Sequence, residues 1–392
     1  MDLRDSEAEA KFRSALRAWL AEAVPAHGEA PPAHDWPARR AYDTGWQRKL
    51  FEAGYAGMSW PAEYGGRDAS PNEQLIYNEE LARADAPYVG VNFVGTLHGG
   101  PTLIAEGTPE QKQRHLPRIL RGEEVWCQGF SEPAAGSDLA SLKTSAVREG
   151  DEYVVSGHKI WCSFAQVADY CELLVRTDPD APKHRGITWL ILPMDAPGLE
   201  IRPLPTLAGE GEFSEVFLDG VRVPVANRVG EENDGWRVTN VTLRFERGTA
   251  FAGELVLLQR FIAELVGLAK RTGRWDEADL RRELGRMAAE VDALWAMVKL
   301  SVCRAARTGM PGLEGSAIKL HYSELYQRMA ERGLELLGRA ALSREDVGAL
   351  PSRRFLAEGL KSLNATIAAG TSQIQRNIVA ERILGLPREP RP

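Results

Sequence analysis

The sequence lacks an apolar run long enough to cross a membrane, and its start lacks the features of a secretory signal. A membrane-spanning helix needs roughly 20 mostly apolar residues, and no segment of these 392 residues approaches that length. The first residues, MDLRDSEAEAKFRSALRAWLAEAVP, are acidic and have a helical period, whereas a signal begins with basic residues and an apolar run. Both absences predict a cytoplasmic protein with no membrane partner.

Cysteine is scarce, and basic charge is not in excess. The four cysteines, Cys127, Cys162, Cys171 and Cys303, have no paired spacing, and no histidine cluster joins them. This pattern predicts a reduced interior without a metal site. The 48 Lys and Arg residues are outnumbered by 55 Asp and Glu residues, with both signs interspersed, for a net charge of -7. A nucleic-acid partner is therefore not expected.

The periodicity of apolar residues changes twice along the chain. The first third is helical: Phe12, Leu16 and Leu20 share one face, and Thr108 to Gln111 has the pattern of a capping box. From about residue 125, short β-type runs alternate with Gly, Pro and Asp turns, and after residue 234 the helical period returns. The length suits two or three domains. We therefore predict an α+β multidomain protein in the order helical, β, helical.

The predicted domains cover residues 1–124, 125–233 and 234–392. The first is an N-terminal helical domain, the second a middle β domain and the third a C-terminal helical bundle. No β-type run is followed by a Gly-rich turn that opens a helix, so the order disfavours a Rossmann dinucleotide domain.

The segment QGFSEPAAGSD, residues 128–138, is the first candidate for chemistry. It is dense in small residues, and its hydroxyls and backbone N–H groups are able to approach an anion or a flavin closely. Considered alone, it is more typical of a surface turn.

The segment AGTSQIQR, residues 369–376, is the second candidate. It has the pattern of a helix N-terminus, where free N–H groups and the helix dipole favour a phosphate. Considered alone, it is also compatible with ordinary helix capping.

Together, in this order around a β-then-helical pattern, the two segments resemble the acyl-CoA dehydrogenase family along the whole chain. Four further stretches support the resemblance: WPAEYGG at 60–66, GTPEQKQRHLPRILRGE at 107–123, SGHKIWCS at 156–163 and GTSQIQRNIVAERILGLP at 370–387. The resemblance implies a middle antiparallel β domain, a C-terminal four-helix bundle, FAD as cofactor and an acyl-CoA thioester as substrate.

The resemblance also implies which residues hold FAD. Gln128, Phe130 and Ser131 would contact the isoalloxazine ring, with Trp161 and Ser163 covering its other side. Without the resemblance, Trp161 would equally be a core aromatic residue on a strand. The remaining positions are Ser137, at the ribityl–phosphate region or the pantetheine entrance of the substrate, and Gly370, Thr371 and Gln373, at the pyrophosphate and adenine side.

The catalytic base departs from the commonest family pattern. A Glu usually precedes Gly-Thr-Ser, but Ala369 stands there and cannot accept a proton; its backbone N–H remains able to donate to the thioester carbonyl. A branch of the family, with the isovaleryl and long-chain types, carries the Glu on an earlier helix just before an Arg. We therefore assign the base to Glu246 and place Arg247 at the substrate. The alternative is an ordinary charged pair near a helix start.

Two further segments do not match the family well. Many members complete the FAD site with Arg-x-x-Phe-Gly and Gln-x-x-Gly-Gly from a neighbouring subunit, where this chain has LAKRTGRWDEADL at 268–280 and ELLGRAA at 335–341. Arg271 or Arg274 could replace the first interaction, but Arg339 stands where a second Gly is usual. The adenine end is then built differently or by an unlike partner subunit.

The leading functional hypothesis is α,β-dehydrogenation of an acyl-CoA to the 2,3-enoyl thioester. Glu246 removes the α proton, the β hydrogen passes as hydride to flavin N5, and electrons continue to an electron-transfer flavoprotein, as in β-oxidation of fatty acids or other lipids. The motifs also resemble bacterial members that handle bulky acyl groups, including steroid side chains. A homotetramer or dimer is usual in the family. The alternatives are a flavin-dependent monooxygenase or oxidase, and one subunit of a heteromeric enzyme.

Overall fold

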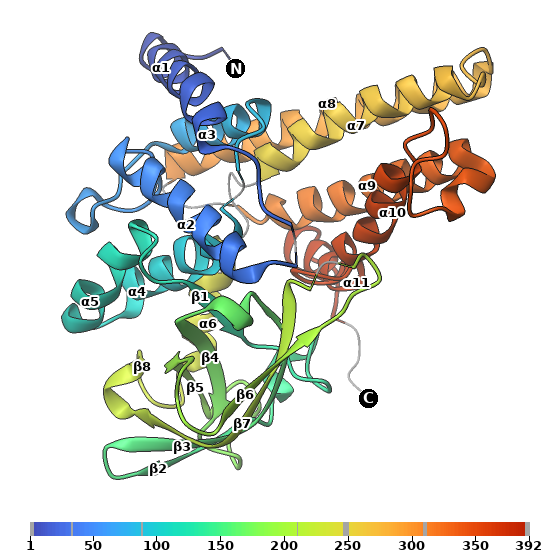
Figure 1. Ribbon diagram of the computed structural model, residues 1–392. Coiled ribbons are helices and arrows are strands. Elements are labelled where there is room, and N and C mark those ends of the chain that lie inside the picture. The colour runs from blue at the N-terminus through green and yellow to red at the C-terminus, as the bar shows by residue number, and fades with distance from the viewer. Residues whose placement is uncertain are drawn as a thin grey trace. The chain divides into compact units, whose positions relative to one another are not determined.

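The computed structural model describes residues 4–32, 34–87, 89–209, 211–245, 251–308 and 312–388, and for residues 243–245 and 308 only the backbone. The chain forms two compact units (Figure 1). The β unit contains residues 19–70 and 86–246, and the bundle unit contains residues 1–18, 71–85 and 247–392. The predicted order of helical, β and helical regions is confirmed. The two units are defined by contacts in space, whereas the three domains were predicted from the order of patterns along the sequence. Their boundaries therefore differ.

The bundle unit is built from long amphipathic helices. They are α3 (Pro71–Arg83), α7 (Phe251–Arg271), α8 (Ala278–Thr308), α9 (Glu314–Leu337), α10 (Ser352–Ala365) and α11 (Ser372–Ile378), together with the first turns of α1 (Glu7–Ala23). Helix α9 packs against α7, α8, α10 and α11. The apolar residues of α8 from Leu284 to Val302 form a buried stripe, because they recur every three or four residues. The core of this unit is therefore helix on helix.

The β unit is built around one sheet of mainly antiparallel strands. They are β1 (Trp126–Gly129), β2 (Ser145–Glu149), β3 (Glu152–Ser163), β4 (Tyr170–Arg176), β5 (Ile187–Pro193), β6 (Leu199–Leu204), β7 (Phe213–Pro224) and β8 (Arg228–Val229). The order across the sheet is β6-β7-β3-β2-β4-β5-β8, and β1 pairs with β4 in parallel. Apolar side chains from β3, β4, β5 and β7 form its core.

Helices α2 (Trp36–Glu52), α4 (Gly100–Glu106), α5 (Pro109–Leu120) and α6 (Gly235–Phe245) complete the β unit. The predicted capping box at the start of α5 is present, with Thr108 and Gln111 bonded reciprocally. Helix α6 begins directly against β5, where a Cβ atom on Gly235 would lie 2.7 Å from the carbonyl carbon of Thr188. Glycine at this position therefore permits the close approach of helix and strand.

Strand β3 contains a β-bulge just before its end. Lys159 pairs with Val216 and Cys162 pairs with Ser214, so three residue steps on β3 lie opposite two on β7. The extra residue shifts the alternation of side chains. Lys159 and Cys162 both face the buried side, whereas Trp161 is 54% exposed with φ of 63°. The bulge thus turns an indole outward between the half-buried Ile160 and the buried Cys162.

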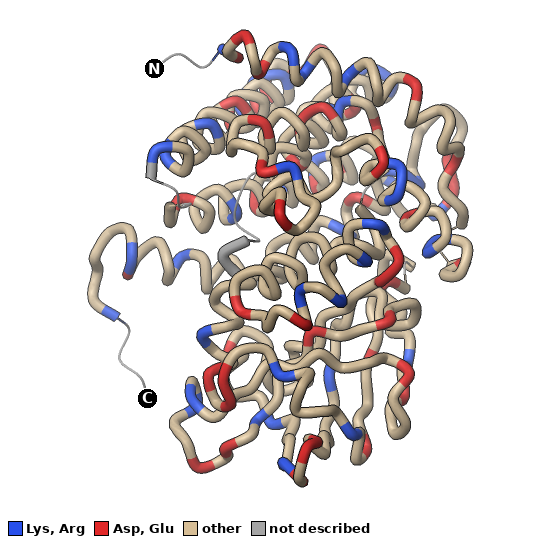
Figure 2. The backbone as a smooth tube through the Cα atoms, turned by 90° about the vertical axis from the view of Figure 1, so that its left-hand side faces the viewer, with Lys and Arg blue, Asp and Glu red and all other residues tan. Residues whose placement is uncertain are grey.

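Charged residues of both signs are distributed over both units. Figure 2 shows Lys and Arg positions close to Asp and Glu positions along the helices and the strands. Within the described segments, no helix is both long and apolar enough to cross a membrane. The interspersed charge agrees with the pattern in the sequence.

Candidate active site

The loop that follows β1 is fixed by close packing and by its own hydrogen bonds. A Cβ atom on Gly129 would lie 2.7 Å from the Sγ atom of Cys171, so this position excludes any larger residue. Phe130 is almost fully buried. Glu132 and Ala135 exchange two backbone hydrogen bonds of 3.0 Å, which closes a tight turn. The predicted flavin-binding loop therefore has a defined shape without a ligand.

The loop lies against β3, which carries the other predicted flavin residues. The backbone N–H of Ile160 donates to the carbonyl oxygen of Ser131 at 3.0 Å. The next residue is the exposed Trp161, and Ser163 ends the strand. The core-aromatic alternative for Trp161 is wrong, because the bulge directs the indole outward. Ser131 and Trp161 thus belong to two adjacent segments, as a two-sided ring site requires.

Gln128 has its amide directed into the protein rather than outward. Its Nε2 atom donates to Oε1 of the buried Glu172 at 2.8 Å and lies 3.2 Å from Nδ1 of His98. His98 is also buried, and its ring packs edge-on against Phe93. These bonds engage the amide nitrogen of Gln128, so a flavin contact would come from its carbonyl oxygen or its backbone. His98 and Glu172 were not identified from the sequence.

Ser137 lies at the far end of the same loop and is exposed. Its neighbour Asp138 forms an exposed ion pair with Lys183 at 2.8 Å. The position suits a contact with a ligand at the surface of the β unit, and the role of Ser137 stays a prediction.

The turn before α11 presents backbone donors. Ala369 and Gly370 have φ angles of 51° and 87°. Their carbonyl oxygens accept hydrogen bonds from Gln375 Nε2 at 3.0 Å and from Lys319 Nζ at 2.7 Å, respectively. In the described part of the chain, the N–H groups of Ala369, Gly370 and Thr371 have no hydrogen-bond acceptor. Because a carbonyl and the following N–H point in opposite directions, the N–H groups of residues 370 and 371 point away from these anchors.

The start of α11 holds further free polar groups. The Thr371 hydroxyl accepts a hydrogen bond from the N–H of Ile374 at 3.2 Å, so Thr371 is the N-cap. Gln373 is exposed on the first turn. The hydroxyl oxygen of Ser372 is buried, and no described residue bonds to it. A buried polar group without a partner requires an explanation, and the described residues do not supply one.

The predicted base Glu246 and its neighbour Arg247 lie outside the described residues, so both assignments stay predictions. A carboxyl group of the bundle unit, that of Glu254, has a raised pKa. Glu254, near the start of α7, accepts a hydrogen bond from the Tyr322 hydroxyl at 2.7 Å. Burial raises the pKa of Glu254, and the bond from Tyr322 offsets only part of that effect. Sequence reasoning missed this pair, although an acidic residue stands within an otherwise apolar stripe.

A recess on the β unit combines aromatic and basic groups. It has a volume of about 660 Å³ and includes Trp236, His184, Arg185 and Arg237 in its lining. Trp236 and His184 meet edge to face at 5.0 Å between ring centroids. Arg237 is paired with Glu106, whereas the side chain of Arg185 forms no ion pair with any described residue. A flat ring and a negative group would both find partners here.

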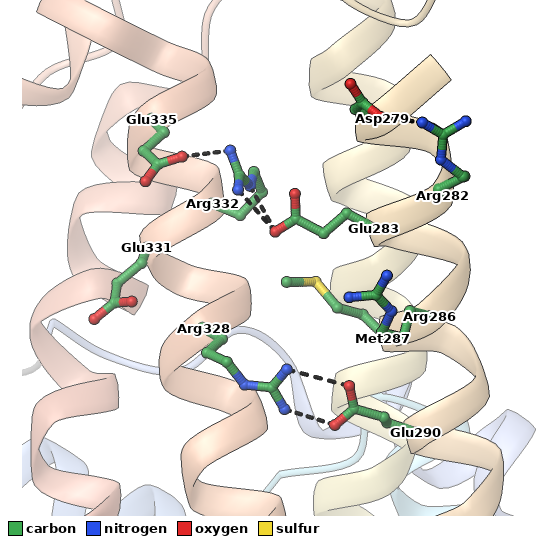
Figure 3. Close-up of a pocket in the computed structure, with 10 residues that line it drawn as sticks. All are labelled: Asp279, Arg282, Glu283, Arg286, Met287, Glu290, Arg328, Glu331, Arg332 and Glu335. Carbon is green, nitrogen blue, oxygen red and sulfur yellow. Dashed lines mark hydrogen bonds and ion pairs between the residues drawn. The ribbon is translucent and has the colours of Figure 1, made fainter. Parts of the chain in front are cut away.

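A second recess, between α8 and α9 of the bundle unit, is an ionic surface rather than a reaction site. It has a volume of about 370 Å³. Figure 3 shows Arg328 and Arg332 on α9 directed toward Glu290 and Glu283 on α8. The Arg328–Glu290 and Arg332–Glu283 pairs measure 2.6 and 2.8 Å. Its arginines and carboxylates therefore largely satisfy one another.

The comparisons with known proteins agree with this geometry. Three domains match in order: the acyl-CoA dehydrogenase N-terminal domain at residues 6–123, the middle domain at 127–221 and the C-terminal domain at 233–384. Acyl-CoA dehydrogenase IpdE1 of Mycobacterium tuberculosis is 38% identical over 383 residues, which are 97% of this chain and 98% of that relative. The chain belongs to the acyl-CoA dehydrogenase family. This acyl-CoA dehydrogenase is therefore an oxidoreductase with FAD as its cofactor.

Two similar solved structures extend the comparison. The first, described as the Tcur3481–Tcur3483 steroid ACAD, has a TM-score of 0.82 and 33% identity, with 99% of this chain and 100% of that chain covered. The second, the ChsE4–ChsE5 complex from Mycobacterium tuberculosis, has a TM-score of 0.82 and 34% identity with the same coverage. The fold of the dehydrogenase is thus shared over its whole length.

The groups present in this acyl-CoA dehydrogenase fit FAD. The β unit offers the exposed indole of Trp161 beside Ser131, which suits the flat face of a flavin. The bundle unit offers the N–H groups of residues 369–371, which have no acceptor among the described residues and suit phosphate oxygens or a carbonyl. The groups that suit the ring belong to the β unit, and those that suit phosphate belong to the bundle unit.

Proposed function

We propose that the protein catalyses FAD-dependent α,β-dehydrogenation of an acyl-CoA to the 2,3-enoyl thioester, with Glu246 as the base. The observation that carries this proposal is the turn at residues 369–371. It offers free backbone donors and, with Ala369, no side chain that could accept a proton. A base from another segment is therefore required, and Glu246 stands before an Arg at the position used by one branch of the family.

The protein groups would divide the reaction as follows. The backbone N–H of Ala369 donates to the thioester carbonyl oxygen, and this bond strengthens as negative charge develops on that oxygen. The Glu246 carboxylate takes the α proton, and Arg247 contacts the substrate. Bound FAD supplies the two-electron acceptor that takes the β hydrogen as hydride. One proton and one hydride leave the substrate, so the product has a C2–C3 double bond.

The assignment of the cofactor contacts is part of the proposal. Phe130, Ser131, Trp161, Ser163 and the carbonyl or backbone of Gln128 would hold the isoalloxazine ring. The pyrophosphate and adenine side would be held by Gly370, Thr371 and Gln373. Ser137, exposed at the end of its loop, would contact the ribityl–phosphate region or the pantetheine arm of the substrate.

Coenzyme A, rather than a carrier protein, is favoured by the recess that contains Trp236 and Arg185. An indole and a histidine ring suit an adenine, and an unpaired guanidinium suits a phosphate. A carrier protein would present neither adenine nor a 3′-phosphate. We therefore propose the nucleotide end of coenzyme A as the ligand of this recess.

A bulky polycyclic acyl group is the proposed substrate class, and an unlike subunit is the proposed partner. A solved relative at 33% identity is described as a steroid ACAD, and another at 34% identity is a complex of ChsE4 with ChsE5. Arg339, in place of a usual Gly, agrees with an FAD site completed by a different chain. A homotetramer or dimer is the alternative. An electron-transfer flavoprotein is the proposed electron acceptor, as is usual in the family.

The central test is anaerobic bleaching of the bound flavin by short, branched, long and steroidal acyl-CoAs. We expect bleaching with at least one bulky acyl-CoA. Glu246→Gln should slow it by about 10²–10⁴-fold, the usual contribution of a general base, while FAD stays bound. Glu254→Gln, which removes a carboxylate eight positions further along the chain, is the control and should bleach at nearly the wild-type rate. Loss of bleaching in the control alone would overturn the assignment of Glu246.

The alternatives give different results in the same experiment. Oxygen-dependent turnover with a hydroxylated product would select a monooxygenase. FAD that is bound only after co-expression with a second related chain would establish the heteromer, which mass measurement of the purified complex would then define.

A further inference from the structure

Lys159 is a fully buried cation in the strand beneath the proposed flavin loop. Its side chain has no exposure to solvent. The ammonium donates to the carbonyl oxygen of Phe130 at 3.1 Å and to Oε1 of Glu132 at 2.8 Å. Lysine is almost never fully buried unless it is paired, because its charge loses hydration. A lysine at this position therefore has a specific role in the loop that it contacts.

Glu132 is the counter-ion of Lys159 and is itself well satisfied. Its carboxylate also accepts the backbone N–H groups of Lys143 at 2.7 Å and Thr144 at 2.8 Å. Burial would raise the pKa of Glu132, but Lys159 and these donors outweigh it and hold the pKa below its ordinary value. Burial lowers the pKa of Lys159, and Glu132 opposes that shift. The two groups form one closed ionic unit within the β unit.

Two consecutive residues of β3 bind three consecutive residues of the loop. The Lys159 side chain binds Phe130 and Glu132, and the Ile160 N–H binds the carbonyl oxygen of Ser131. The next residue of β3 is the outward-facing Trp161. The two proposed walls of the flavin site are therefore joined through one tripeptide.

The bond from Lys159 also sets the direction of a backbone donor. The Phe130 carbonyl and the Ser131 N–H belong to one planar peptide unit, so they point in opposite directions. With the carbonyl directed at the buried ammonium, the Ser131 N–H points away from it. No hydrogen-bond acceptor for this N–H exists among the described residues. Loss of the ammonium would leave this peptide plane free to rotate.

We propose that Lys159 is a positioning residue for the flavin: by fixing the peptide between Phe130 and Ser131, it aims the Ser131 N–H and holds Ser131 at a fixed place beside Trp161. The role rests on the proposed function, in which the loop binds FAD. Lys159 does not contact the cofactor itself. Its effect is on affinity and on the environment of the ring, not on the proton or the hydride that is transferred.

A purely structural role of the Lys159–Glu132 ion pair can be distinguished by experiment from the positioning role of Lys159. Lys159→Met leaves a buried carboxylate without its counter-ion, whereas Lys159→Met combined with Glu132→Gln removes both charges. Replacing a whole buried ion pair by neutral groups is often harmless to stability. The double variant should therefore recover the Tm that Lys159→Met loses. It does not restore the bond to the Phe130 carbonyl.

The experiment measures FAD affinity by titration of the apoprotein, the absorption spectrum of the bound flavin, and amide hydrogen exchange of the peptide spanning residues 129–132. We expect Lys159→Met and the double variant to weaken FAD binding by about tenfold or more, as for the loss of one well-placed hydrogen bond. Both should speed exchange in the loop and alter the fine structure of the flavin spectrum. Glu132→Gln keeps the bond to Phe130, so it should lower the Tm but weaken FAD binding much less.

Arg40→Met is the matched control. Arg40 also binds one backbone carbonyl, that of Val167 at 2.6 Å, and one carboxylate, that of Asp169 at 2.7 Å, and neither acceptor belongs to the loop. This variant should lower the Tm and leave FAD affinity unchanged. A double variant with wild-type FAD affinity and loop exchange would overturn the role of Lys159 alone. A wild-type protein that binds no FAD, alone or with a partner chain, would overturn the proposed function as well.

Discussion

The two units each contain a partly enclosed glutamate, and the two groups are stabilised in opposite ways. Glu132 in the β unit has an ammonium and two backbone N–H groups as partners, and its pKa is lowered. For Glu254 in the bundle unit, the bond from the Tyr322 hydroxyl only partly offsets burial, and the pKa is raised. The number and charge of the donors, rather than enclosure alone, therefore set the direction in which the pKa of such a group moves.

This contrast separates a carboxylate whose pKa is lowered by its partners, that of Glu132, from one whose pKa is raised by burial, that of Glu254. Glu132 is held ionised, so it can serve as a fixed anchor for Lys159 and the loop. Burial raises the pKa of Glu254, so a smaller rise in proton activity neutralises it. Carboxyl groups with raised pKa values often lie at functional sites, but structural pairs show the same shift. Glu254 therefore serves as the control for Glu246 rather than as its replacement.

The largest expected effect is on stability, and it tests the contrast directly. Lys159→Met should lower the free energy of unfolding by about 3–5 kcal/mol, the usual result of leaving one member of a buried ion pair alone. Glu254→Gln removes no charged partner and should change it by less than about 1 kcal/mol. Urea unfolding of the two variants measures both values. Equal losses of unfolding free energy in the two variants would contradict the proposed difference between the two glutamates.

The second test is the pH dependence of unfolding. The pKa of Glu132 is lowered on folding, so its contribution is present above the unfolded value of about 4.3 and is lost as the pH falls through the folded value. The pKa of Glu254 is raised on folding, so the folded state binds more protons in the window above about 4.3 and stability falls as the pH rises through it.

The contribution of each glutamate to the pH dependence of unfolding is obtained by comparing the wild type with the corresponding Gln variant. Subtracting the Glu254→Gln profile from the wild-type profile should leave a term that decreases with rising pH. Subtracting the Glu132→Gln profile should leave one that increases from acid toward neutral pH. Each unit of pKa difference corresponds to about 1.4 kcal/mol. Thermal unfolding between acid and neutral pH provides the measurement, and slopes of one sign for both would contradict the assignment.

The third test compares the backbones of the two regions. Ala369 and Trp161 both have positive φ angles without being glycine. Ala369→Gly relieves the left-handed strain but increases the freedom of the unfolded chain, so we expect a gain of up to about 1 kcal/mol. Trp161→Gly also loses the indole and should weaken FAD binding. Differential scanning calorimetry with FAD titration distinguishes the two, and a destabilised Ala369→Gly would show that the turn is not strained.

The smallest expected effect concerns an exposed ion pair. Arg328 on α9 binds Glu290 on α8 across the ionic groove of Figure 3, and the Arg328 side chain is 46% exposed. Arg328→Met should change the free energy of unfolding by less than about 1 kcal/mol, because water and salt screen such pairs. A loss comparable to that of Lys159→Met would show that burial is not what distinguishes the two pairs.

Much of the fold and part of the site follow from the sequence. The apolar period of α8, the capping box at Thr108 and the change to β-type runs near residue 125 are local signals, and the structure has all three. Loop 128–138 was identified from small residues that allow close approach. Such features depend on neighbours along the chain, which a sequence displays directly.

The features that the sequence did not reveal depend on distant partners. Gln128 directs its amide to Glu172, which lies 44 positions further along the chain. Lys159 was part of a recognised motif, but its role was not predicted. It lies an even number of positions after the buried residues Tyr153 and Val155, on the same face of the strand. An ionisable residue at an apolar position of a strand was the available signal. Its counter-ion, Glu132, could not be chosen without the fold.

The bulge in β3 constrains the length of the chain more than its composition. One extra residue between Lys159 and Cys162 reverses the alternation, so Cys162 returns to the buried face directly after the exposed Trp161. Deleting a single residue there would move every later side chain of the strand to the opposite face. Substitutions at the outward positions can accumulate during evolution, whereas insertions and deletions in this short stretch should be excluded from functional descendants.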